Sequence, residues 1–85
     1  MQERNDSPEL LPELTYGQKA VGITFNPGGT SDVDRCKQMF ANCIDQMNQL
    51  RLDSNSTEVK RMCSVAITDA QSAQMWAVKA ITWKD

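Results

Sequence analysis

Apolar residues recur at intervals of three and four through the middle of the chain, a spacing that indicates an amphipathic helix. The positions in this stripe are Val33, Cys36, Phe40, Cys43, Met47 and Leu50. Thr30 or Ser31 suits the N-cap, and Asp32 and Asp34 suit the positive end of the helix dipole. The pattern predicts a helix over residues 31–51 that packs nearly parallel or antiparallel to a neighbour.

A second helix is predicted over residues 56–83, a range without proline or glycine. Asn55 followed by Glu58 resembles a capping box at its start. One face carries small side chains that would let another helix approach closely, namely Val59, Ala66, Ala70, Ala73, Ala77 and Ala80. Larger apolar residues fall on the other faces, namely Met62, Val65, Ile67, Met75, Trp76, Val78, Ile81 and Trp83. A helix that is apolar around most of its circumference is surrounded by protein.

The connection between these helices is so short that they must fold back as an antiparallel hairpin. A two-helix hairpin is too thin to enclose a core, because each helix touches only one neighbour. We therefore expect an all-α homo-oligomer in which copies of the hairpin cover one another. The alternative is that the N-terminal segment folds over the exposed side.

The N-terminal third is less regular. Residues 1–13 contain four acids and two prolines and are expected to form a flexible or loosely docked arm. Residues 14–25 are more apolar, but Gly17 and Gly22 leave a short helical turn and an extended segment equally open. Residues 26–30 have the composition of a turn. Residues 14–85 would then form one helical hairpin domain.

Composition narrows the chemistry. The 85 residues carry nine basic and eleven acidic side chains, a net charge of −2 that argues against binding long nucleic acid. The absence of histidine removes the commonest acid–base group and metal ligand. Cys36, Cys43 and Cys63 lack the spacing of a metal site and are expected to be buried, reduced thiols. No catalytic residue, metal, cofactor or membrane span is predicted.

The remaining polar side chains suit recognition of a small anion. Lys37, Arg61 and Lys79 lie beside the apolar stripes, where cations from neighbouring chains can converge on phosphates. Tyr16 and Phe25 are candidates for stacking on a base. A polar cluster within the second helix needs partners, which a ligand or a neighbouring chain can provide, and it includes Thr68, Gln71 and Ser72.

The stretch AITDAQSAQMWAVKAI, residues 66–81, resembles a motif of phage anti-CBASS cyclic-oligonucleotide sponges, whose helical hairpin domain is shared with the Thoeris anti-defence sponges. The run VDRCKQMFANCID, residues 33–45, is similar to the lysine-bearing helix of that family. The matching positions in the second helix are Thr68, Gln71, Met75, Lys79, Ala80 and Ile81.

This resemblance implies a homo-oligomer, typically a hexamer, in the cytoplasm of the infected bacterial host. Such a protein sequesters cyclic dinucleotides or trinucleotides without cleaving them. By resemblance, Lys37 is the phosphate-binding lysine and Phe25 the nearest stacking aromatic. Ile67 stands where the family uses an arginine for trinucleotides, with Arg61 as a substitute. The β-rich portion of larger Thoeris-type members is absent, which disfavours their cyclic ADP-ribose ligands.

Two other functions are compatible with the residues. The apolar faces would serve an oligomeric protein-interaction module or an inhibitor of a host protein. A small DNA-binding regulator is disfavoured by the acidic charge balance and by the lack of a basic recognition helix.

Overall fold

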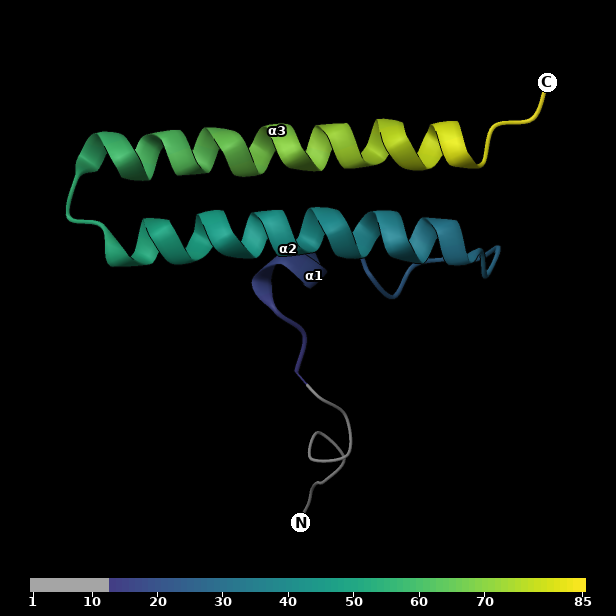
Figure 1. The fold of residues 1–85 in the computed structure, drawn as a ribbon, viewed down its shortest axis with the longest axis horizontal. Helices are drawn as coiled ribbons and strands as arrows, with labels where there is room; N and C mark the ends of the chain where they lie inside the picture. Colours follow the sequence, from purple (N-terminus) through teal and green to yellow (C-terminus); the bar gives the residue numbers. More distant parts are fainter. Residues whose placement is uncertain (1–12) are drawn as a thin grey trace, which may run out of the picture.

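The computed structural model describes residues 13–85, and over this range the chain contains three helices and no strand. They are α1 (Tyr16–Ala20), α2 (Ser31–Asp53) and α3 (Thr57–Ile81). Helices α2 and α3 lie side by side and antiparallel, and α1 packs on α2 (Figure 1). The predicted helical hairpin is confirmed. The arm expected at residues 1–13 lies, except for Glu13, outside the described residues.

The ends of the two long helices follow from their caps. Thr30 is the N-cap of α2, and Asp32 and Asp34 lie in its first turn. Helix α3 begins one residue later than the proposed capping box required, because the hydroxyl of Ser56 accepts a hydrogen bond from the Val59 backbone N–H at 3.2 Å. Glu58 is thereby the second helical residue rather than the third, and its carboxylate pairs with Arg61 instead.

The segment that the sequence left undecided is a one-turn helix followed by a tight turn. Thr15 and Gln18 form a capping box at its start, with hydrogen bonds of 3.0 and 2.9 Å. At its end, the backbone N–H of Ile23 donates to the Gln18 carbonyl, and the N–H of Gly22 donates to the Lys19 carbonyl. Gly22 has a φ of +63°, so this is a Schellman ending that favours glycine. The chain is thereby turned back toward α2.

A small core forms where the segment after α1 meets the two long helices. Val21, Ala41, Ile44 and Ile67 are buried together, one from the N-terminal segment, two from α2 and one from α3. Five partly buried side chains pack around them, namely Ala20, Ile23, Phe40, Met47 and Ala70. The N-terminal segment therefore covers one side of the hairpin, as the alternative to self-association required.

The buried face of α2 is rotated from the predicted stripe. Val33 is buried as expected, but Cys43 and Leu50 are exposed, and Lys37, Ala41 and Ile44 take the central positions. The prediction was wrong there because it treated a lysine as a boundary residue. Packing of the N-terminal segment moves the buried side toward that lysine.

The predicted alanine face of α3 is also not its buried face. Cys63, Ile67 and Gln74 are buried, whereas Ala73 and Ala80 are exposed. Ile67, which was assigned to another face, belongs to the core. The physical reason is that the larger side chains fill the centre of the space between the helices, so Ala66, Ala70 and Ala77 are only half-buried at its edge.

Candidate functional site

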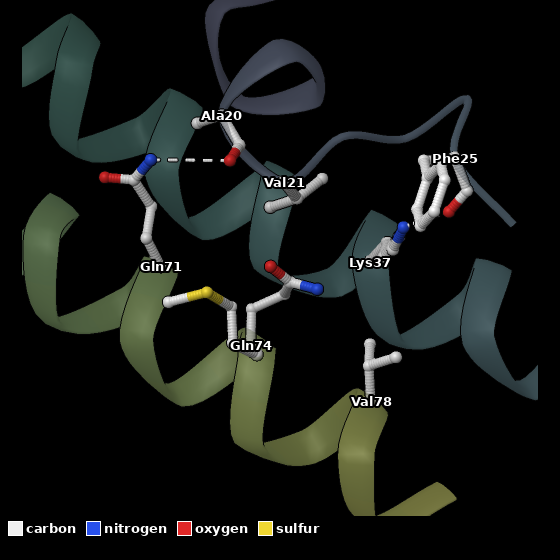
Figure 2. A pocket seen from close by; sticks show the side chains of 8 residues that line it. Ala20, Val21, Phe25, Lys37, Gln71, Gln74 and Val78 are labelled. Atoms are coloured by element: carbon white, nitrogen blue, oxygen red, sulfur yellow. Dashed lines mark hydrogen bonds between the residues drawn. The ribbon is translucent and has the colours of Figure 1, made fainter. Parts of the chain in front are cut away.

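A pocket of about 440 Å³ opens where the segment after α1 passes over the groove between α2 and α3. All three parts of the chain contribute to it (Figure 2). Its lining consists of Ala20, Val21, Phe25, Lys37, Gln71, Gln74, Met75 and Val78. Three of the eight site residues proposed from the sequence, Phe25, Lys37 and Gln71, are thus brought together. A volume of this size is in the range of small-molecule sites.

Lys37 supplies the charge of the pocket. Its side chain is 4% exposed, an unusual burial for a lysine. The ammonium donates to the carbonyl of Gly22 at 2.9 Å and to the carbonyl of Phe25. It also lies 5.4 Å from the centre of the Phe25 ring, in cation–π geometry. The lysine thus holds the loop that follows α1 against α2.

The charge of this ammonium is not neutralised by a carboxylate of residues 13–85. The ion pairs within that range are Arg35 with Asp32 and Arg61 with Glu58, both on the surface. Carbonyl dipoles compensate a buried cation only in part, so the pocket retains a positive potential. An anionic group that enters it gains an attraction strengthened by the low local dielectric.

Phe25 stands at the rim, with 69% of its surface exposed. It also lines a second pocket of about 400 Å³, together with Lys37 and Val78. The remaining lining of this second pocket is Asn26, Pro27, Gly28, Val33 and Thr82. Asn26 fixes this loop through its amide, which donates to the Thr30 carbonyl at 2.9 Å and to Asp34 Oδ1 at 2.8 Å. The Phe25 ring and the Lys37 ammonium group therefore border both pockets.

Two carboxamides occupy the α3 side of the first pocket (Figure 2). Gln71 Nε2 donates to the carbonyl of Ala20 at 3.4 Å, a contact between residues 51 positions apart. Gln74, which sequence analysis did not select, is only 6% exposed. The sequence signal that could have identified Gln74 is its position three residues after Gln71, because residues three apart share a helix face.

The other site residues proposed from the sequence do not line this pocket. Tyr16 lies on α1, where its ring centre is 5.5 Å from the guanidinium carbon of Arg51. Arg61 is near the interhelical loop, and its hydrogen bond with Glu58 lowers the pKa of that carboxyl. The remaining three are exposed on α3, namely Thr68, Ser72 and Lys79. Arg61 and these three share one side of the helix by their spacing. Their contact with a ligand stays a prediction.

The cysteines differ from one another in environment. All three are free, but only Cys63 is buried, whereas Cys36 is half-buried and Cys43 is exposed. The expectation of buried thiols is therefore wrong for Cys43, which lies on the side of α2 that the N-terminal segment leaves open. Among residues 13–85, no cluster of metal-ligating side chains occurs. No helix of that same range is long and apolar enough to cross a membrane.

Comparison with known families agrees with this arrangement. A profile described as "Acb2/Tad1, hairpin domain" matches residues 18–82, more than three quarters of the chain. The chain belongs to this family. No curated protein and no solved structure matches the chain. The family assignment confirms the resemblance carried by the two helices, and it covers most of α1 as well.

Members of the Acb2/Tad1 hairpin family act in general as phage anti-defence sponges, which sequester a signal rather than convert it. The pocket described above lies within the matched region. Ile67 is 3% exposed and packs in the core. Its side chain therefore packs within the hairpin of this chain.

Proposed function

We propose that this protein binds cyclic dinucleotides and sequesters them as an anti-defence sponge without cleaving them. The observation that carries the proposal is the buried ammonium of Lys37, which lines a pocket and has no carboxylate partner among residues 13–85. A phosphodiester would supply the missing negative charge. The exposed ring of Phe25 next to this cation would stack on a base.

The shape of the site suits a ligand with alternating charged and aromatic parts. Phe25 and Lys37 border both adjoining pockets. A cyclic dinucleotide has two bases joined through two phosphates, so one base can enter each hollow while a phosphate meets the ammonium between them. Charge-assisted hydrogen bonds of this kind are about twice as strong as neutral ones.

Binding without turnover is proposed from the side chains available. The chain has no histidine. The described pocket residues also include no carboxylate that could act as a base. A sponge requires affinity and abundance, and a preformed pocket avoids the cost of ordering a loop on binding.

The direct test is calorimetric titration of the full chain with a panel of cyclic dinucleotides and trinucleotides, followed by recovery of the ligand from denatured protein. We expect saturable binding of at least one cyclic dinucleotide and its recovery unmodified. Recovery of a linear or hydrolysed product would identify an enzyme, and failure to bind any member of the panel would refute the proposal.

Trinucleotide binding needs another route, because Ile67 is in the core. Arg61 and Lys79 lie on the same exposed side of α3 as Thr68 and Ser72. We call these four residues the polar stripe of α3, and all of them are exposed to solvent in a single chain. Contact with a second chain would bring further cations to it, which supports an intersubunit trinucleotide site.

Self-association is proposed from the outer face of α3, which we define as Met62, Val65, Asp69, Ala73, Trp76 and Ala80. These residues recur at spacings of three and four and are all exposed. Met62, Val65 and Trp76 have 50%, 48% and 68% of their surfaces exposed. Apolar residues in such a repeat form the contact stripe of packed helices, and the alanines allow close approach. We propose a homo-oligomer, a hexamer by family resemblance, built through this face.

Replacing Trp76 by glutamate is expected to shift the assembly toward smaller species, because a charge would be buried against apolar partners. Sedimentation velocity at matched concentrations measures the shift. Gln46→Glu is the matched control, since it adds the same charge at an exposed position of α2. Equal sedimentation of both variants and the unmodified protein would place the interface elsewhere.

A second candidate function, an oligomeric module that binds or inhibits a host protein, is favoured by the same outer face of α3, whose residues other than Asp69 are apolar. In that case the outer face of α3 would receive a foreign chain. Sedimentation of the isolated protein separates the two functions. A monomer favours the protein-binding module, and a stable hexamer that retains cyclic nucleotide favours the sponge.

A further inference from the structure

We propose that Gln74 is a second phosphate-binding residue, whose amide N–H donates to the same phosphodiester group that meets Lys37. The proposal rests on the proposed function and concerns the first pocket, which both side chains line. In Figure 2 the amide nitrogen of Gln74 lies on the side of Lys37, and its oxygen lies on the side of Val21. The amide therefore presents its donor group toward the cation of the pocket.

The carboxamide of Gln74 is buried without a partner in the chain. Gln74 is 6% exposed, and its side chain has no hydrogen-bonding partner among residues 13–85. The neighbouring amide of Gln71, by contrast, donates to the Ala20 carbonyl. Buried amides are ordinarily paired, so an unpaired one that lines a pocket points to a partner that enters the pocket. A methionine would fill the same volume with no polar group to desolvate, so packing alone does not account for a glutamine here.

Lys37 also keeps a free hydrogen-bond donor. A lysine ammonium carries three N–H donors. Two of them donate to the carbonyls of Gly22 and Phe25, and the third has no acceptor within the described part of the chain. The non-bridging oxygens of one phosphodiester supply a negative charge and two acceptors, so that group can satisfy both the ammonium and the Gln74 amide. A carbonyl of a base would accept from the amide but would leave the ammonium without a counter-charge.

The second pocket does not offer this combination of donors. The amide nitrogen of Asn26 already makes two hydrogen bonds within the chain. The hydroxyl of Thr82 donates to the Val78 carbonyl at 2.9 Å. Of the side chains that line the second pocket, Lys37 is therefore the one with a free donor. We accordingly expect the phosphate on the first-pocket side of Lys37, where Gln74 lies.

The test is calorimetric titration of the full chain with cyclic di-AMP, cyclic di-GMP and cyclic GMP–AMP, comparing the unmodified protein with Gln74→Met. Loss of a hydrogen bond to a charged group should weaken binding by about tenfold or more. Gln74→Glu should weaken binding further, because a carboxylate would face the phosphate. Gln46→Met and Gln46→Glu are the matched controls, since Gln46 is exposed on α2, and they should bind as the unmodified protein does.

The phosphorus-31 spectrum of the bound nucleotide separates a contact with phosphate from a contact with a base. A phosphorus resonance of the bound nucleotide should shift between the unmodified protein and Gln74→Met, while the base proton resonances stay in place. The ligand-free variant should melt at an equal or higher temperature, because no hydrogen bond within the chain is lost. A lower melting temperature would show that the amide serves the fold, and would overturn the proposal.

Two further results would overturn the assignment of Gln74. One is unchanged affinity in both Gln74 variants, and the other is a shift confined to the base protons. In either case the unmodified protein still binds a cyclic dinucleotide, and the proposed function stands. Failure of the unmodified protein to bind any cyclic nucleotide would refute the proposed function itself, so the two failures are distinguishable.

Discussion

Replacing Lys37 by glutamate is expected to abolish binding of cyclic dinucleotides, and replacing it by glutamine to weaken binding by about 10- to 100-fold. A charge-assisted hydrogen bond contributes about 1.5–3 kcal/mol, and each 1.4 kcal/mol corresponds to about a factor of ten in affinity. Glutamate goes further because it places a negative charge where a phosphate would sit. Calorimetric titration measures both effects.

The matched control is Lys60→Gln. Lys60 also donates to a backbone carbonyl, that of Arg51 at 2.7 Å, but it lies near the loop between α2 and α3. Its replacement removes the same charge and should leave affinity nearly unchanged. Lys37→Arg, which keeps the charge, should retain part of the affinity. If Lys37→Gln binds as tightly as the unmodified protein while its fold is intact by circular dichroism, Lys37 is not the phosphate ligand.

Replacing Gly17 by alanine is expected to detach α1 from α2 and to destabilise the chain by about 1–3 kcal/mol, as overpacking does. A Cβ atom at this position would overlap the backbone carbonyl of Ala41 and lie 2.8 Å from Asp45 Oδ1. It would also strain the hydrogen bond of 2.6 Å that the Gly17 N–H donates to that carboxylate. Thermal unfolding should show a lower melting temperature, by about 4–8 °C for each kcal/mol.

Gly28→Ala is the control for this effect. A Cβ atom there would meet only the Thr30 hydroxyl, at an ordinary contact distance of 3.4 Å. The two variants should therefore differ in melting temperature at the same protein concentration, with Gly28→Ala close to the unmodified protein. Equal melting temperatures would show that α1 is not docked on α2 through Gly17. Because Phe25 follows α1, we also expect Gly17→Ala to weaken nucleotide binding.

The hairpin was predictable because its signals are local. Both long helices contain apolar repeats, start at polar caps and are separated by a short polar loop, so each can be located within a window of about 20 residues. The family resemblance rested on the same two segments. The candidate residues Lys37 and Gln71 lie on these helices, and their side chains were identified by type and position alone.

The details that the sequence could not provide depend on distant contacts. Lys37 can be buried because its ammonium donates hydrogen bonds to the carbonyls of Phe25 and Gly22, which lie 12 and 15 residues earlier in the chain. The segment around Ala20 reaches Gln71 across 51 positions. A prediction from periodicity treats lysine and glutamine as surface residues. It therefore placed the buried face of α2 away from Lys37 and did not select Gln74. Only the docking of the N-terminal segment reveals both.

The residues that line the pocket beside Lys37 come from one chain, although intersubunit sites were expected. Each newly synthesised chain would then have this pocket before it assembles with other copies. The amount of cyclic nucleotide bound would therefore rise in proportion to the number of chains made. The fraction of cyclic dinucleotide that is sequestered would be set by the ratio of protein chains to cyclic dinucleotide molecules. Mixing defective and intact subunits should lower capacity only in proportion to the defective fraction.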